Sequence, residues 1–153
     1  MAEGRRRPRL FPRLAPGERK LALWIAAIAL LGVAVATYLV YIHYAGIKPI
    51  CAAGGDGGCE KVQTSDYADL AGIPVAVLGL IGYLAILGSL FVRGDLGRLA
   101  GAAIALSGFG FSMYLTYREL FTIKAICQWC VGSAVLMTLL AILTVVRLLK
   151  ADP

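Results

Sequence analysis

Four long apolar runs, separated by short polar segments, dominate the pattern of hydrophobic and polar positions along the chain. They cover residues 21–44, 73–92, 99–117 and 126–146, and His43 is the only acidic or basic side chain inside them. As helices, these runs are about 29 to 36 Å long, which matches a hydrocarbon core about 30 Å thick. No run alternates with period two, and lipid offers backbone groups no partners outside the segment. The pattern therefore predicts an all-α integral membrane protein, folded as a four-transmembrane-helix bundle.

The distribution of positive charge predicts the orientation of these helices. Hydrophobic residues make up 59% of the chain and charged residues 16%, whereas soluble proteins are about 45–50% apolar. Eleven lysines and arginines lie in the N-terminal tail, between the second and third runs, and after the fourth, against four on the other side. The positive-inside rule then places both termini in the cytoplasm. We expect a basic tail at 1–20, a four-helix membrane domain at 21–147, a cytoplasmic C-terminus at 148–153, and a long outer loop at 45–72 between helices 1 and 2.

Two other interpretations explain the basic N-terminus less well. A cleaved signal peptide has a shorter apolar region followed by a small-x-small cleavage site, and no convincing site follows the first run. A nucleic-acid-binding tail is conceivable, but positive charge flanking a membrane helix accounts for the arginines without one. We therefore expect the lipid bilayer as a partner, no nucleic acid, and a multi-pass location in the cell inner (cytoplasmic) membrane.

The four cysteines carry the candidate chemistry, and the charge pattern places all of them on the extracytoplasmic side. Cys51 and Cys59 bracket the glycine-rich spacer "AAGGDGG" in the outer loop. Cys127 and Cys130 lie at the start of the fourth run, three residues apart on one helix face. The positive end of a helix favours the thiolate, which is the nucleophile in disulfide exchange. In an oxidising compartment such as the periplasm, pairing of such cysteines is expected.

Three arrangements of these cysteines are consistent with their spacing. Two inert disulfides are possible, in a membrane scaffold or transporter subunit. A four-cysteine zinc site is another, although only one of the two pairs has the short spacing typical of such sites. The third is a relay, in which electrons enter at the flexible outer pair and leave through the pair at the membrane edge. An acceptor there must be lipid-soluble and take two electrons, which a quinone does.

Several motifs, taken together and in order, resemble the bacterial homologues of vitamin K epoxide reductase (VKOR). They are the cysteine pair in the first outer loop, Ser65 six residues after its second member, Gly-Ile-Pro at 72–74, and "CQWC" opening the fourth run. The resemblance covers about residues 20–147. It implies a four-helix bundle enclosing a quinone near the outer surface, and an oxidoreductase acting on thiols and disulfides with a quinone of the menaquinone or ubiquinone type as acceptor.

The resemblance also implies a role for each cysteine. Cys51 and Cys59 would accept electrons from a thioredoxin-like (DsbA-like) partner, Cys59 would exchange with Cys127, and Cys130 would face the quinone. Ser65 would lie by the quinone or the active cysteines, and an alternative or additional role for it is the N-cap of a short helix "SDYADL". The DsbB family shares four spans, four cysteines and a quinone, but its Cys-x-x-Cys lies in the first outer loop, the reverse of the order here.

The sequence departs from the family pattern in two respects. Animal enzymes that reduce vitamin K epoxide hold the quinone oxygens with an asparagine and a tyrosine. This chain contains no asparagine, and Ala134 stands one turn after Cys130, at the position of that tyrosine. Disulfide generation is therefore favoured over epoxide reduction. Many bacterial relatives carry a fused thioredoxin-like domain, and because this chain ends at Pro153 we expect its partner to be a separate protein.

Other polar and small residues leave two interpretations open. Tyr83 falls in the middle of a span, so its hydroxyl either lines a quinone cavity or bonds across helices. Glu119, Asp66 and Asp69 are conceivable proton relays, although solvated loop charges are the simpler interpretation. The many glycines of the second and third runs indicate close helix packing or room for a flat ligand.

Overall fold

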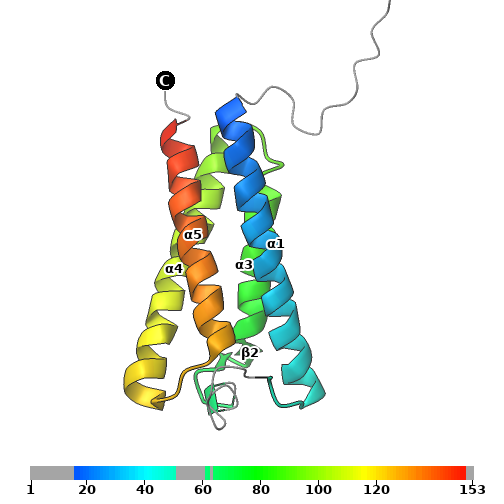
Figure 1. The fold of residues 1–153 in the computed structure, drawn as a ribbon, viewed down its shortest axis with the longest axis vertical. Helices are drawn as coiled ribbons and strands as arrows, with labels where there is room; N and C mark the ends of the chain where they lie inside the picture. Colours follow the sequence, from blue (N-terminus) through cyan, green and yellow to red (C-terminus); the bar gives the residue numbers. More distant parts are fainter. Residues whose placement is uncertain (1–15, 51–60, 63, 151–153) are drawn as a thin grey trace, which may run out of the picture.

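The computed structural model describes residues 16–50, 61–62 and 64–150, and within them it is a bundle of long helices (Figure 1). The elements, in chain order, are α1 (Pro16–Ala45), β1 (Asp69–Leu70), β2 (Ile73–Pro74), α3 (Val75–Ser89), α4 (Asp95–Arg118), the π-helical turn η1 (Glu119–Ile123) and α5 (Gln128–Lys150).

The helices form a four-sided arrangement in which α1 contacts α3, α3 contacts α4, α4 contacts α5, and α5 closes the ring on α1. Successive helices run in opposite directions. Consequently the start of α1, the α3–α4 connection and the end of α5 lie at one end of the bundle (Figure 1). The segment after α1, the β1–β2 hairpin, η1 and the start of α5 lie at the other end, which we call the cysteine end.

Small residues on α1 allow the close packing of this ring. Buried positions on α1 recur every three or four residues, at Ala22, Ile25, Ala29, Gly32, Ala36, Leu39 and Ile42. A methyl group added at Gly32 would overlap the ring of Tyr83 on α3. Only glycine therefore fits at this contact between the two helices. Small residues at helix contacts are typical of membrane bundles, where backbone proximity replaces hydrophobic driving force. In the third run, the packing interpretation of glycine applies at Gly101, where an added methyl group would overlap the Ser89 side chain of α3.

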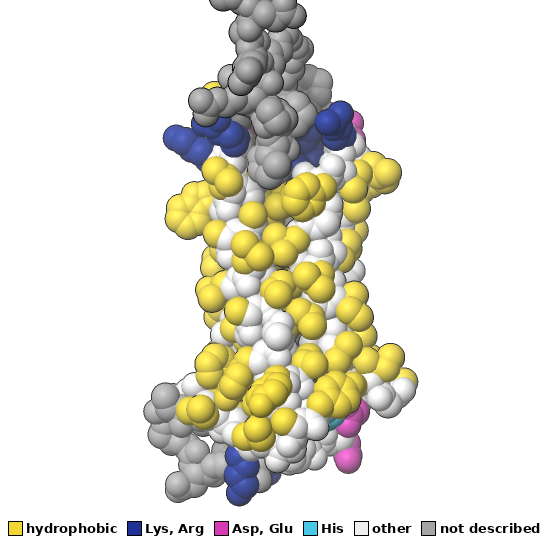
Figure 2. All heavy atoms as spheres, turned by 90° about the vertical axis from the view of Figure 1, so that its right-hand side faces the viewer, with side chains coloured by type: hydrophobic (Ala, Val, Ile, Leu, Met, Phe, Trp, Pro, Cys, Tyr) yellow, Lys and Arg dark blue, Asp and Glu magenta, His cyan; other side chains and the backbone are white. Residues whose placement is uncertain are grey.

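The outer surface of the bundle is apolar over most of its length. Figure 2 shows hydrophobic side chains along the middle of the face it presents, with Lys and Arg side chains confined to its two ends. Among the described residues, three helical segments, Pro16–Ala45, Asp95–Ile123 and Gln128–Lys150, are long and apolar enough to cross a membrane, and α3 is a shorter apolar helix. These features are those of a helical membrane protein, as the apolar runs predict.

The second apolar run forms a shorter helix than its length predicts. Its first residues, Ile73 and Pro74, pair in antiparallel register with Asp69 and Leu70, so they belong to a hairpin. Proline has no N–H, and Pro74 has an extended backbone (φ −57°, ψ 134°), so the helix begins at Val75. The turn residues Ala71 and Gly72 both have positive φ (54° and 85°), as in the two-residue turns that match the twist of a hairpin.

Candidate active site

The Cys-x-x-Cys motif lies where the chain enters α5. Cys127 directly precedes the helix, and its carbonyl accepts a hydrogen bond from the Val131 N–H at 3.0 Å, which makes Cys127 the N-cap residue. Cys130 follows in the first helical turn. The Cys127 side chain is fully buried, whereas Cys130 is half-buried. The two side chains interact with each other, as the spacing of three residues predicts.

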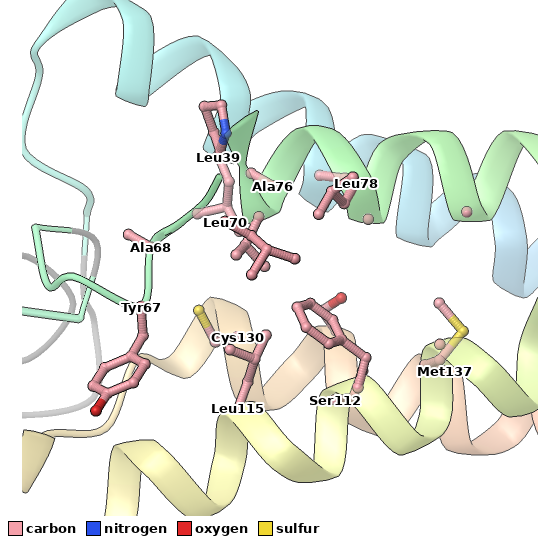
Figure 3. Close-up of a pocket in the computed structure, with 18 of the residues that line it drawn as sticks. Leu39, Tyr67, Ala68, Leu70, Ala76, Leu78, Ser112, Leu115, Cys130 and Met137 are labelled. Atoms are coloured by element: carbon pink, nitrogen blue, oxygen red, sulfur yellow. The ribbon is translucent and has the colours of Figure 1, made fainter. Parts of the chain in front are cut away.

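Cys130 lies on the wall of a cavity of about 270 Å³ that is lined by residues of all four helices and of the segment that leads into α3. In Figure 3 the Cys130 sulfur faces the cavity, with Leu70 on the opposite wall and Leu115 beside it. Most of the lining is aliphatic or aromatic, and a few polar groups interrupt it. The polar side chains are His43, Ser65, Tyr67, Tyr83, Ser112, Thr116, Glu119, Cys130 and Ser133. Such an apolar cavity with a few convergent polar groups is typical of a small-molecule site.

Two of the residues predicted to contact the quinone, Ser65 and Tyr83, line this cavity. The Ser65 hydroxyl donates to the Val62 carbonyl at 2.7 Å. Residues 64–68 form turns that lead into β1, so the alternative role of Ser65 as the N-cap of a helix at 65–70 is wrong. A local hydroxyl–carbonyl bond stabilises a turn in competition with a helix. The Tyr83 hydroxyl lies 2.7 Å from the Ser133 hydroxyl and donates to the Ser133 carbonyl at 3.0 Å, so it bonds across helices and borders the cavity at once.

Glu119 is buried against the cysteines, so the interpretation of this residue as a solvated loop charge is wrong. Its side chain is 4% exposed, and its carboxylate Oε2 accepts from the Cys127 N–H at 3.3 Å. The carboxyl also interacts with the Cys130 side chain. Asp66 and Asp69, by contrast, are exposed, as the simpler interpretation predicts. The sequence signal is the helical spacing of Glu119 from Leu115 and Thr116, which line the same cavity. The π-helical turn that follows brings Cys127 to its carboxylate.

Trp129, between the two cysteines, holds the residue that precedes Cys51. Its indole N–H donates to the Ile50 carbonyl at 2.8 Å. The Ile50 N–H donates in turn to the Tyr38 hydroxyl at 3.1 Å, and the Tyr38 and Trp129 rings are in contact, with centroids 4.9 Å apart. We call this arrangement of Tyr38, Ile50 and Trp129 the loop clamp. It fixes the beginning of the 51–60 segment beside the Cys-x-x-Cys motif.

On the other side of the same segment, the chain packs against Cys127. Val62 is buried, and with Cys127 it forms a small apolar cluster, against which Ile123, Ala125 and Trp129 pack. Cys51 and Cys59 themselves lie outside the described residues. Cys51 is one residue from the clamped Ile50, and Cys59 is three residues from Val62.

Residues 23–145 match the sequence model of the vitamin K epoxide reductase family, and this stretch includes all four cysteines and most of the helical bundle. The chain belongs to the vitamin K epoxide reductase family. Membership makes it an oxidoreductase whose function is quinone-related disulfide redox chemistry, in agreement with the placement of its Cys-x-x-Cys motif.

The cavity residues fit the quinone that members of this family use. Gly79 and Gly82 of α3 line the cavity, and a methyl group added to either would meet no atom within 4 Å. Both glycines therefore enlarge the space available to a flat ring, unlike Gly32, which serves helix contact. A quinone supplies a two-electron acceptor when bound. The residues that would hold it are those of the aliphatic wall, with Ser65, Tyr83 and Cys130 as polar contacts.

One further comparison with the family bears on specificity. Ala134, which stands where the animal enzymes have a tyrosine, is buried but is not part of the cavity lining. Ser133 and Met137 of the same helix do line the cavity.

Within residues 16–50, 61–62 and 64–150 no group of three His, Cys, Asp or Glu side chains is arranged to hold a metal ion. The zinc alternative involves Cys51 and Cys59, which are not among those residues.

Proposed function

We propose that the protein is a quinone-dependent membrane thiol oxidase that sustains disulfide formation outside the cytoplasm. Electrons pass from a thioredoxin-like partner to Cys51 and Cys59, then to Cys127 and Cys130, and from there to a quinone of the menaquinone or ubiquinone type. The observation that carries this proposal is the anchoring of both ends of the 51–60 segment on the Cys-x-x-Cys motif, whose Cys130 borders an apolar cavity.

The orientation in the membrane supports this order of transfer. The start of α1, the α3–α4 connection and the end of α5 share one end of the bundle, which carries six of the ten described lysines and arginines, so the positive-inside rule makes it cytoplasmic. The cysteine end then faces the extracytoplasmic side of the inner membrane, where a thioredoxin-like partner meets the outer pair. Cys130, one turn further into the bundle than Cys127 and on the cavity wall, is the cysteine next to the quinone.

The chain's own residues divide the work of the relay. Cys127 receives the incoming thiolate from Cys59, because Val62 holds that end of the outer segment against it. Cys130 is the sulfur released in this exchange, and it lies beside the cavity. The aliphatic wall excludes water, which prevents loss of electrons to side reactions. The Tyr83–Ser133 hydrogen bonds fix the position of α3 relative to α5 across the cavity.

The direct test mixes the purified protein with a reduced thioredoxin-like protein and a quinone, and follows quinone absorbance. We expect Cys127→Ala and Cys130→Ala each to abolish thiol-dependent quinone reduction while the protein remains folded in detergent. Ser107→Ala is a matched control, because Ser107 is exposed on α4 and its hydroxyl bonds within its own helix, to Ala103. A scaffold with structural disulfides predicts the opposite pattern: lower stability in the cysteine variants and no thiol-dependent quinone reduction in any of the proteins.

A trapping experiment tests the order of exchange. In Cys130→Ala the exchange at Cys127 cannot be reversed by its neighbour, so the Cys59–Cys127 linkage should accumulate and be readable by mass spectrometry. Recovery of only a Cys51–Cys59 linkage in that variant contradicts the proposed route.

A further inference from the structure

Among the described residues, Glu119 is the one acidic side chain on the cavity wall, and it touches both members of the Cys-x-x-Cys pair. Its side chain is 4% exposed. Removing a carboxyl group from water is unfavourable unless partners replace the lost hydrogen bonds. A leucine would fill an apolar wall at no such cost. A buried carboxyl at this position therefore calls for a role that an apolar residue cannot perform.

Glu119 lies on the cavity side of α4 by ordinary helical spacing. Its φ of −60° and ψ of −45° continue the helix, and Leu115 and Thr116, four and three residues before it, line the same cavity. Residues Glu119–Ile123 then form a π-helical turn, and Lys124 after it has a left-handed backbone with φ 56°. The N–H groups of Lys124 and Ala125 both donate to the Glu119 carbonyl, which closes the turn. π-Helical turns are frequent at functional sites, and here the turn brings Cys127 back to the Glu119 carboxylate.

We propose that Glu119 is a catalytic residue that exchanges a proton with the sulfur of Cys130. The inference deepens the proposed function and rests on it. When a dithiol reduces the Cys127–Cys130 disulfide, its thiolate attacks the Cys127 sulfur, and a new disulfide forms to Cys127. The Cys127–Cys130 bond breaks, its electron pair stays on the Cys130 sulfur, and the Glu119 carboxyl gives that sulfur a proton. The second thiolate of the dithiol then displaces the Cys127 sulfur, which completes the reduction of the pair. When a quinone takes up the two electrons and the Cys127–Cys130 disulfide forms again, the Glu119 carboxylate takes the proton back from Cys130.

Thiol–disulfide exchange depends on the stability of the departing sulfur, so protonation of the leaving group accelerates it. The Cys130 sulfur faces a mostly apolar cavity, whose wall offers few groups that could supply this proton. A carboxyl in contact with it provides the nearest exchangeable proton on the same wall. The wall also carries His43, Tyr67 and Tyr83 as ionisable groups, so the assignment has to be tested by substitution.

A purely structural role is the competing explanation, since the Glu119 carboxylate accepts from the buried Cys127 N–H. Glutamine separates the two roles. Its side-chain carbonyl keeps an acceptor for that N–H, but the amide cannot exchange a proton at neutral pH. A structural residue therefore tolerates Glu119→Gln, whereas a proton-exchanging residue does not.

The first measurement needs neither quinone nor partner. In Cys127→Ala, the rate of Cys130 alkylation by iodoacetamide is followed across pH by site-resolved mass spectrometry. Two interacting groups titrate in two steps that belong to the pair, so we expect two ionisations in this variant and one when Glu119→Gln is added. Asp66→Asn, at an exposed carboxyl outside the cavity lining, is the matched control and should leave both ionisations in place.

The second measurement is the rate at which dithiothreitol reduces the oxidised Cys127–Cys130 pair. We expect Glu119→Gln to slow it at least about 100-fold, the lower bound typical of general acid catalysis, and Asp66→Asn to leave it unchanged. An unchanged rate in Glu119→Gln, or a single ionisation in the Cys127→Ala protein itself, overturns the inference. The latter result is informative even if Glu119→Gln does not fold. Quinone is absent from both assays, so their outcomes do not depend on whether the protein reduces a quinone. A failure of the proposed oxidase activity can therefore be told apart from a failure of this inference.

Discussion

Replacing Trp129 with phenylalanine removes one hydrogen bond from the loop clamp and preserves the rest of it. The indole N–H that donates to the Ile50 carbonyl at 2.8 Å is lost. The phenylalanine ring can still pack on the Tyr38 ring, because the centroids of the Tyr38 and Trp129 rings are 4.9 Å apart. The hydrogen bond from the Ile50 N–H to the Tyr38 hydroxyl is also retained. The substitution therefore loosens the beginning of the 51–60 segment without emptying the space between α1 and α5.

The size of the effect follows from the single bond removed. An intramolecular hydrogen bond contributes a net of about 0.5–1.5 kcal/mol, and the Ile50 carbonyl is near enough to solvent to find water instead. If the clamp holds the outer cysteine pair in position for exchange, the population in that position falls by about 2- to 13-fold. The rate of electron transfer from the outer pair to Cys127 should fall by the same factor. Reduction of the Cys127–Cys130 pair by dithiothreitol, which bypasses the outer pair, should not change.

Rapid mixing with a reduced thioredoxin-like protein, followed by acid quenching and mass spectrometry, measures the transfer step. Tyr38→Phe removes the other hydrogen bond of the clamp and should slow the same step by a similar factor. Tyr41→Phe is the matched control, because Tyr41 lies on the same helix with an exposed side chain. If Trp129→Phe slows reduction by dithiothreitol as much as reduction by the protein partner, the clamp does not act through the outer pair.

Three further predictions concern packing and the cavity. Gly32→Ala places a methyl group into the Tyr83 ring and should destabilise the protein by about 1–3 kcal/mol, seen as a lower thermal midpoint in detergent. Gly79→Leu, at a cavity position with no atom within 4 Å of the added Cβ, should leave the thermal midpoint nearly unchanged but raise the quinone concentration needed for half-maximal rate. Tyr83→Phe removes the hydrogen bonds to Ser133 and should cost about 0.5–1.5 kcal/mol of stability; an unchanged midpoint would show that these bonds do not hold α3 to α5.

The helices were predictable from the sequence because membrane spans are defined by length and polarity alone, yet their ends were not. The apolar run starting at residue 21 marks where lipid begins, whereas α1 starts at Pro16, since Glu18 and its neighbours continue the helix into the polar region. At the second run, which begins at residue 73, the helix starts later than the apolar run and not earlier. Pro74 belongs to the apolar pattern but pairs with Asp69 in the hairpin and has an extended ψ of 134°, so α3 begins at Val75.

The parts of the candidate site that depend on residue type and spacing were predictable from the sequence. The parts that depend on the direction of a side chain were not. The Cys-x-x-Cys motif at a helix start is a local pattern, and the structure places it as the pattern predicts. Glu119 carries only the signal of its helical spacing from Leu115 and Thr116, and a carboxyl between two membrane runs is usually solvated. Its burial is completed by the π-helical turn after it, which brings Cys127 to its carboxylate. The roles of Trp129 and Val62 likewise depend on contacts between distant segments.

The two anchors of the outer segment suggest why a relay of this kind works without tight binding between its redox pairs. Ile50 is held by Trp129, and Val62 packs on Cys127, so both ends of the segment that carries Cys51 and Cys59 meet the motif they would react with. Tethering on a short chain turns a bimolecular exchange into an intramolecular one, at an effective concentration in the millimolar range or above. A single weak hydrogen bond at one anchor then tunes the rate of transfer, because it changes how often the pairs meet and not how fast their sulfurs react. In the proposed function the partner has to find the outer pair by diffusion, so the clamp would act only after electrons have entered the protein.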